Sequence, residues 1–142
     1  YKADTGNKKM DIIKFTKEYV EKQWNHKLPV EIKGLDSMEV LFNPLEFSII
    51  IDNIADNARK ANATKLQIVF EGNADSHCIK WIDDGYGIQP DVDVSKMFEQ
   101  GFTTTNGTGI GLYTVQKYAN KMNATVTINN KYKDGFELLM RI

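Results

Sequence analysis

Residues 45–63 of this chain, LEFSIIIDNIADNARKANA, combine an apolar stripe with a polar face at helical spacing. The apolar residues recur at steps of three and four, as in an amphipathic helix that packs on a core. They are Phe47, Ile50, Ile51, Ile54, Ala58 and Ala61. Asn53, Asn57 and Lys60 stand at i, i+4 and i+7, so two carboxamides and an ammonium group share one face. Because asparagine is a mediocre helix former, this face is either a ligand site or an ordinary solvated surface.

A second distinctive segment, DDGYGI at residues 83–88, directly follows a mostly apolar run. An acid at a strand end followed by two glycines predicts a sharp turn whose backbone a ligand can approach closely. The alternative is a tight turn capped by Asp83, because Asp-Gly pairs favour turns for local reasons alone.

Two further segments follow, MFEQGFTTT at residues 97–105 and GTGIGL at residues 107–112. The first predicts a loop held by Phe98 and Phe102, with an ordinary Ser/Thr loop as the alternative. The second places glycines at the start of a helix, where free backbone N–H groups and the positive end of the helix dipole suit a phosphate. It is neither a Walker sequence nor a Rossmann fingerprint, because no GK[ST] follows and the glycines run GxGxG.

The periodicity of the rest of the chain predicts a mixed sheet covered by helices on one face. Helices are expected over residues 10–26 and 109–122 as well as 45–63, the one over 109–122 ending at Asn123. Strands are expected around residues 30–32, 40–42, 66–70, 78–83, 125–129 and 136–142.

Composition narrows the function classes. With 142 residues, 42% of them hydrophobic, we expect a single domain over residues 1–142. A net charge of -1 argues against a nucleic-acid partner and against direct contact with an anionic membrane. Cys78 is the one cysteine, and no apolar run approaches the roughly 18 residues of a membrane span, so we predict a cytoplasmic location for this domain. A membrane anchor in other segments of the full-length protein is left open. The start at Tyr1, without Met or leader, predicts a fragment of a longer protein.

Taken in order, the four segments resemble the GHKL nucleotide-binding superfamily, and in particular the catalytic ATP-binding domain of bacterial sensor histidine kinases. The resemblance covers roughly residues 45–142. It implies the Bergerat-type ATP-binding fold, an α/β (α+β) two-layer sandwich with a mixed sheet and three main helices on one face. It also implies ATP and Mg²⁺ as cofactors.

The resemblance assigns roles to individual residues. It implies that Asn57 is the magnesium ligand, that Asn53 is a polar neighbour of the phosphates and that Lys60 contacts a phosphate. Asp83 would accept a hydrogen bond from the adenine amino group, and Gly87 would let the ring lie against the backbone. The other implied nucleotide-binding residues are Gly85, Ile88, Phe98, Phe102, Thr103, Thr104, Gly107, Thr108, Gly109, Ile110, Gly111 and Leu112.

Position 53 separates branches of the superfamily. ATP-hydrolysing relatives similar to Hsp90, gyrase and MutL carry a glutamate four residues before the magnesium asparagine, whereas this chain has Asn53. Without a carboxylate to activate water, phosphoryl transfer to a protein nucleophile is favoured over hydrolysis. The alternative function is an ATP-gated module of a chaperone-like or DNA-repair-like ATPase, or a domain that only binds nucleotide.

The histidine kinase interpretation also predicts partners. Neither His26 nor His77 lies in a phosphoacceptor context, so the phosphorylated histidine is expected in an upstream dimerisation domain. A response regulator would receive the phosphoryl group, and the full-length protein is expected to be a homodimer.

Overall fold

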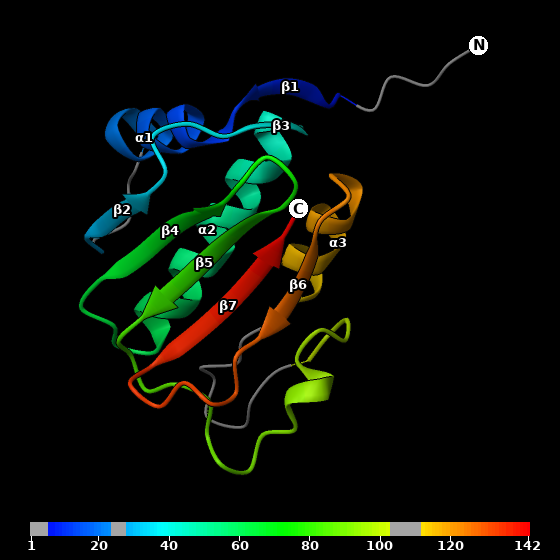
Figure 1. Cartoon of the computed structure of the whole chain (residues 1–142). Helices are drawn as coiled ribbons and strands as arrows, with labels where there is room; N and C mark the ends of the chain where they lie inside the picture. Colours follow the sequence, from blue (N-terminus) through cyan, green and yellow to red (C-terminus); the bar gives the residue numbers. More distant parts are fainter. Residues whose placement is uncertain (1–5, 24–27, 103–111) are drawn as a thin grey trace.

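The structure, a computed structural model of the chain, describes residues 6–23, 28–102 and 112–142. A five-stranded sheet forms one layer and helices form the other (Figure 1). The elements are β1 (Lys8–Asp11), α1 (Ile12–Gln23), β2 (Val30–Gly34), β3 (Glu39–Phe42), α2 (Pro44–Lys60), β4 (Leu66–Gly72), β5 (His77–Asp83), the short 3-10 helix η1 (Val94–Lys96), α3 (Tyr113–Lys121), β6 (Thr125–Ile128) and β7 (Phe136–Arg141). The expected two-layer sandwich with a mixed sheet and three main helices is confirmed.

The main sheet has the strand order β2-β4-β5-β7-β6. β2 runs parallel to β4, while the pairs β4–β5, β5–β7 and β6–β7 are antiparallel, so the sheet is mixed. Buried and partly exposed residues alternate along β4 and β5, because successive side chains of a strand point to opposite faces. Ile79, Trp81 and Asp83 therefore share the buried face of β5, and Asp83 is its last residue.

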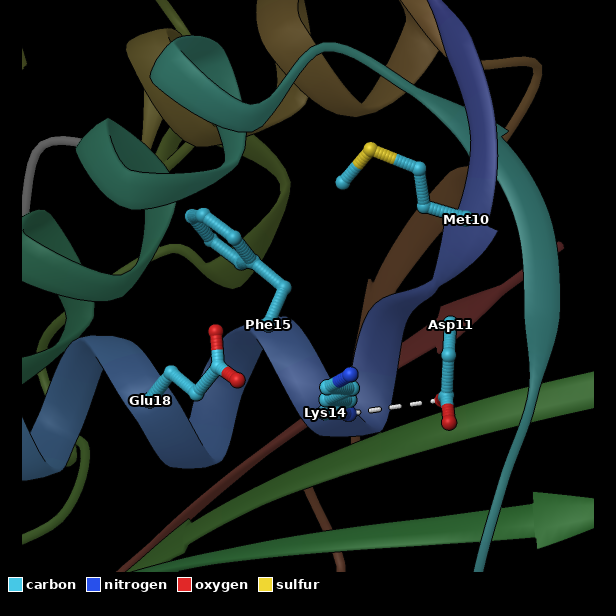
Figure 2. A pocket seen from close by; sticks show the side chains of 5 residues that line it. All are labelled: Met10, Asp11, Lys14, Phe15 and Glu18. Carbon is cyan, nitrogen blue, oxygen red and sulfur yellow. Dashed lines mark hydrogen bonds between the residues drawn. The ribbon is translucent and has the colours of Figure 1, made fainter.

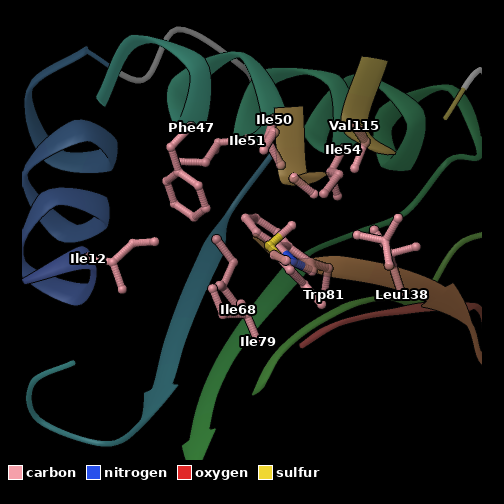
Figure 3. Packing of buried hydrophobic residues seen from close by; sticks show 14 of the residues in the cluster. Ile12, Phe47, Ile50, Ile51, Ile54, Ile68, Ile79, Trp81, Val115 and Leu138 are labelled. Carbon is pink, nitrogen blue, oxygen red and sulfur yellow. The ribbon is translucent and has the colours of Figure 1, made fainter. Parts of the chain in front are cut away.

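Helix α2 has clear start and stop signals. The Asn43 side chain accepts a hydrogen bond from the backbone N–H of Glu46 at 3.2 Å, and Pro44 occupies the first turn. Lys60 and its neighbour Arg59 in the last turn suit the negative end of the helix dipole. Figure 3 shows the apolar stripe of α2 packed against the sheet, with Phe47, Ile50, Ile51 and Ile54 facing Ile68, Ile79, Trp81 and Leu138. Each such buried side chain contributes about 1.5–3 kcal/mol, so this stripe holds α2 in place.

The first helix begins two residues later than the expected range of 10–26. Residues 10 and 11 belong instead to β1, which pairs antiparallel with β3 in a separate two-stranded sheet. Asp11 starts α1 there, because its carboxylate accepts hydrogen bonds from the backbone N–H groups of Ile13 at 3.0 Å and Lys14 at 3.3 Å. It also accepts one from Met38 at 3.1 Å, which joins α1 to the segment before β3. Asp11 also lines a surface hollow of about 370 Å³ beside α1. Figure 2 shows the side chains that line it.

The third helix lies within the expected range of 109–122, of which residues 109–111 fall outside the described part of the chain. Asn123 ends it, as predicted, in the left-handed conformation with φ 61°, and the Ala124 N–H bonds to the Ala119 carbonyl at 2.9 Å. Across the described ranges, no helix combines the length and apolar character that a bilayer crossing requires.

Candidate functional site

The polar face of α2 carries the three side chains that the sequence singled out. Asn53 and Asn57 are half-buried and Lys60 is exposed. Within residues 6–23, 28–102 and 112–142, none of these three side chains makes a hydrogen bond or ion pair. The neighbouring Asp52 differs, because its carboxylate accepts from the Tyr19 hydroxyl at 2.8 and 2.9 Å. The binding of a ligand by these two carboxamides stays a prediction.

Asp83 is a buried acid at the end of β5. Its side chain is only 5% exposed and accepts a hydrogen bond from the Gly85 N–H at 2.8 Å. Burial raises the pKa of this carboxyl above its usual range, and the charge of Asp84 adds to the shift, while the N–H groups of Gly85 and Phe136 oppose it. The hydrogen bond between this acid and the adenine amino group stays a prediction.

Three glycines allow the backbone around Asp83 to pack closely. A Cβ on Gly85 would lie 2.6 Å from the Ala61 carbonyl oxygen, and one on Gly87 would lie 2.6 Å from the Gly135 carbonyl oxygen. Gly87 also has φ +74°, which disfavours any side chain. Gly135 is tighter still, since its Cβ would lie 1.9 Å from the Asp83 carbonyl oxygen. The glycines of the 83–88 segment therefore have a packing role, and their contact with a ligand stays a prediction.

Hydrogen bonds fasten the turn after β5 to the end of α2. The carboxylate of Asp84 accepts from the backbone N–H of Thr64 at 2.7 Å, from the Thr64 hydroxyl, and from the N–H of Lys65 at 3.2 Å. The Tyr86 N–H donates to the Ala61 carbonyl at 2.9 Å. We call this set the helix–turn contact; its residues are Ala61, Asn62, Thr64, Lys65, Asp84, Gly85 and Tyr86.

The segment that follows the turn packs on the core. Phe98 and Phe102 are half-buried against the core cluster, as expected for residues that hold a loop, and Ile88 packs there as well. Met97 is buried, and its carbonyl accepts a hydrogen bond from the N–H of Leu112 at 3.1 Å. This bond ties residues 84–102, which lie below the sheet in Figure 1, to the start of α3.

The expected site is only partly within the described ranges. Thr103, Thr104, Gly107, Thr108, Gly109, Ile110 and Gly111 lie outside them. Leu112 is described and fully buried, its side chain belongs to the core, and its backbone N–H and carbonyl are bonded to Met97 and Gln116.

The residues that sequence reasoning missed are Asp84, its partner Thr64, and Gly135. A second acid in DDG was the one signal for Asp84, and its partners about twenty residues earlier could not be inferred from local spacing. The sequence around Gly135 indicates only a hairpin turn. The atom that excludes a side chain there is the carbonyl oxygen of Asp83, which is distant in the sequence.

A mixed sheet under three helices, with an asparagine-bearing helix fastened beside a buried strand-end acid, defines an ATP-binding α/β sandwich of the GHKL class. The family comparison agrees: a family model described as "Histidine kinase-, DNA gyrase B-, and HSP90-like ATPase" matches residues 43–142. The chain belongs to this family. The resemblance inferred from the four segments is thereby confirmed.

Similar proteins are sensor kinases. The histidine protein kinase SaeS of Staphylococcus epidermidis is 29% identical over 135 residues, which cover 85% of this chain and 37% of SaeS. The sensor protein kinase PilS of Pseudomonas aeruginosa is 24% identical over 110 residues, covering 72% of this chain and 21% of PilS. The chain thus spans less than two fifths of the length of these relatives.

Solved structures share the fold. The ATP binding domain of PrrB from Mycobacterium tuberculosis superposes with a TM-score of 0.76 at 20% identity, covering 96% of each chain. The histidine kinase domain of the E. coli osmosensor EnvZ gives a TM-score of 0.70 at 21% identity, covering 99% of this chain and 89% of that one.

Proposed function

We propose that this chain binds Mg-ATP between α2 and the turn after β5, and donates the γ-phosphoryl group to a histidine in another part of the full-length protein. The observation that carries the proposal is the placement of two polar features at one edge of the fold. Asp83 offers a buried acceptor at the end of β5, and α2, fastened to the adjoining turn, offers two carboxamides that make no hydrogen bond within the described residues.

The adenine end of the proposed site is Asp83. Its carboxylate can accept a hydrogen bond from the amino group of adenine, whereas guanine would present a carbonyl oxygen to the same acceptor. Burial strengthens the discrimination between adenine and guanine, because a buried acceptor that the ligand leaves unpaired cannot accept a hydrogen bond from water instead. The site is thus expected to prefer ATP to GTP.

The phosphate end of the proposed site is α2. Magnesium favours oxygen ligands and retains water and substrate phosphates, so the single carboxamide of Asn57 suffices as its protein ligand. Lys60 is exposed and has no ion-pair partner among the described residues, and it supplies a cation for a phosphate oxygen.

Transfer rather than hydrolysis follows from the chemistry of position 53. A general base for water needs a titratable group, and a carboxamide does not accept a proton at neutral pH. Holding an acceptor in line with the phosphoryl group then becomes the main task of catalysis.

The acceptor is expected to come from outside the described fold. His77 stands at the opposite end of β5 from Asp83, roughly 20 Å away at about 3.3 Å per residue. A dimerisation domain carrying the phosphorylated histidine, and a response regulator that receives the phosphoryl group, complete the proposed pathway in a homodimeric sensor kinase of the cytoplasm.

The test uses these 142 residues with radiolabelled ATP, measuring phosphate release and acid-labile labelling in parallel. Alone, the chain should bind Mg-ATP but release no phosphate and label nothing. Labelling should appear when the His-bearing segment of the full-length protein is added, and Asn57→Ala should abolish it while Asn120→Ala, on the exposed side of α3, should not. Rapid phosphate release by the chain alone, lost in Asn57→Ala, would instead establish the ATPase alternative.

A further inference from the structure

The helix–turn contact is unusually dense for an exposed location. Asp84 lies on the surface, yet its carboxylate accepts three hydrogen bonds from two consecutive residues, Thr64 and Lys65. The hydroxyl of Thr64 is the main cause that holds the pKa of Asp84 below its usual range, which means that the charged form makes these bonds. Charge-assisted bonds of this kind are about twice as strong as neutral ones.

A second group of bonds lies beside the first. The Tyr86 N–H donates to the Ala61 carbonyl at 2.9 Å, and the Tyr86 hydroxyl accepts from the Asn62 side chain. Asn62 has φ 58°, the left-handed conformation that ends α2 and turns the chain toward β4. Gly85 permits this contact, since any Cβ would meet Ala61.

These bonds join two segments that lie far apart in the sequence. The segment 61–65 links the end of α2 to β4, and the turn 84–87 leaves the end of β5. The backbone pair Leu66 and Asp83 lies at the margin of the β4–β5 ladder, so both segments leave the sheet there. Beyond this pair, the hydrogen bonds of the helix–turn contact join the turn directly to the end of α2.

We propose that Asp84 and Thr64 are positioning residues that hold the proposed adenine acceptor, Asp83, in register with the proposed magnesium ligand, Asn57. The inference rests on the proposed function, because it assigns the two ends of Mg-ATP to the turn and to α2. Neither Asp84 nor Thr64 needs to touch the nucleotide. Their effect is therefore expected on ligands that span both ends and not on ligands that reach only one.

This expectation separates positioning from simple stabilisation. If the turn moves freely relative to α2, only a fraction of molecules has both ends correctly placed, and the apparent affinity for a spanning ligand falls by that fraction. A ligand limited to the adenine end meets Asp83 and the turn, whose mutual geometry is kept by the Gly85 hydrogen bond. Its affinity should then be nearly unchanged.

The experiment compares dissociation constants of Mg-ATP and of adenosine by titration calorimetry or by NMR. Asp84→Ala and Thr64→Val should each weaken Mg-ATP binding, Asp84→Ala by about five-fold, while adenosine changes by less than about two-fold. Asp84→Asn should restore most of the affinity, because its amide oxygen can still accept from the backbone N–H groups and its nitrogen can donate to the Thr64 hydroxyl.

Asp11→Ala is the matched control. Asp11 also accepts three hydrogen bonds, two from backbone N–H groups at the start of α1 and one from the N–H of Met38 in a separate segment, and it lies beside the hollow in Figure 2. The Asp11→Ala replacement should lower the free energy of unfolding without changing the ratio of the affinities for Mg-ATP and adenosine. Amide exchange at Thr64 and Lys65 should accelerate in Asp84→Ala and not in Asp11→Ala.

The outcomes distinguish this inference from the proposed function. Wild-type affinity for Mg-ATP in Asp84→Ala, or an equal loss for Mg-ATP and adenosine, overturns the positioning role and leaves the proposed site intact. Failure of the unmutated chain to bind Mg-ATP overturns both. A selective loss for Mg-ATP with rescue by Asp84→Asn supports both.

Discussion

The replacement Asp83→Asn is expected to weaken ATP binding while leaving the unliganded protein at least as stable. The two effects have opposite signs because the carboxylate is costly to the fold and useful to the ligand. Asp83 is 5% exposed, and burial is the first cause that raises its pKa. The native state therefore binds the proton of this carboxyl more tightly than the unfolded state does.

The sign of the pH dependence follows from that difference. Ionisation of Asp83 reduces the free energy of unfolding as the pH rises from the ordinary aspartate range through the raised native pKa. At pH values above the raised native pKa, the full cost of burying the charge is present. Asparagine carries no charge, and its oxygen can still accept the hydrogen bond from the Gly85 N–H, which is 2.8 Å long in the wild type. The free energy of unfolding of the variant in urea at neutral pH should therefore equal or exceed that of the wild type.

The effect on binding comes from the second carboxylate oxygen, which does not bond to Gly85. In asparagine the single oxygen accepts from Gly85, so the group that faces the adenine amino group is the NH₂, a second donor. A hydrogen bond to a charged acceptor is worth about 1.5–3 kcal/mol, so ATP affinity should fall about ten-fold or more. The same amide can donate to the guanine carbonyl, so the preference for ATP over GTP should narrow.

Calorimetric titration of both variants with ATP and GTP, beside urea unfolding, tests the reasoning. Asp83→Ala should also lose ATP affinity but gain none for GTP, because it offers no donor. Unchanged ATP affinity in Asp83→Asn would remove Asp83 from the site. A large loss of stability in the same variant would show that its charge supports the fold.

Three further outcomes are expected. Asn57→Ala should lose the magnesium-dependent part of ATP affinity and keep the fold, because alanine is the better helix former; equal magnesium enhancement in calorimetry would exclude it as a ligand. Tyr19→Phe should lower the free energy of unfolding in urea by about 1 kcal/mol, because it removes the hydrogen bond to Asp52. Burial and Asp52 raise the pKa of Tyr19 from 10.0 to about 12, so the free energy of unfolding of the wild type should fall between those two pH values, and that of the variant should fall less. Gly135→Ala should cost about 2 kcal/mol or more, because its Cβ would lie 1.9 Å from the Asp83 carbonyl oxygen; a wild-type unfolding midpoint would refute that steric argument.

Periodic elements were predictable because their pattern is local. The apolar residues of α2 recur at steps of three and four along its 17 residues. The helix runs from Pro44 to Lys60, so it begins one residue before the expected range of 45–63 and ends three residues before the end of that range. The strands β4, β5, β6 and β7 lie within two residues of their expected ranges. Asn123 signalled the end of α3 through its tolerance for positive φ.

Elements that depend on distant partners were not predictable in this way. β1 has four residues, two of them exposed lysines, and exists because β3 pairs with it. Met10 and Asp11 fit the helical spacing of the residues that follow, so only the capping bonds of Asp11 reveal the true start of α1. In the site, spacing brought Asn53 and Asn57 to one face, but the bonds that fix the turn against α2 link residues about twenty positions apart.

The burial of Trp81 gives this protein a built-in optical probe. The indole is 1% exposed, its ring lies 5.9 Å from that of Phe47, and its N–H has no acceptor among the described residues. An indole in such dry, apolar surroundings fluoresces at short wavelength, and it stands two residues before Asp83 on the same side of β5. The sequence holds one other tryptophan, Trp24, so a Trp24→Phe background would leave Trp81 as the sole emitter. Occupancy at the neighbouring carboxylate could then be followed by emission intensity without attaching a dye.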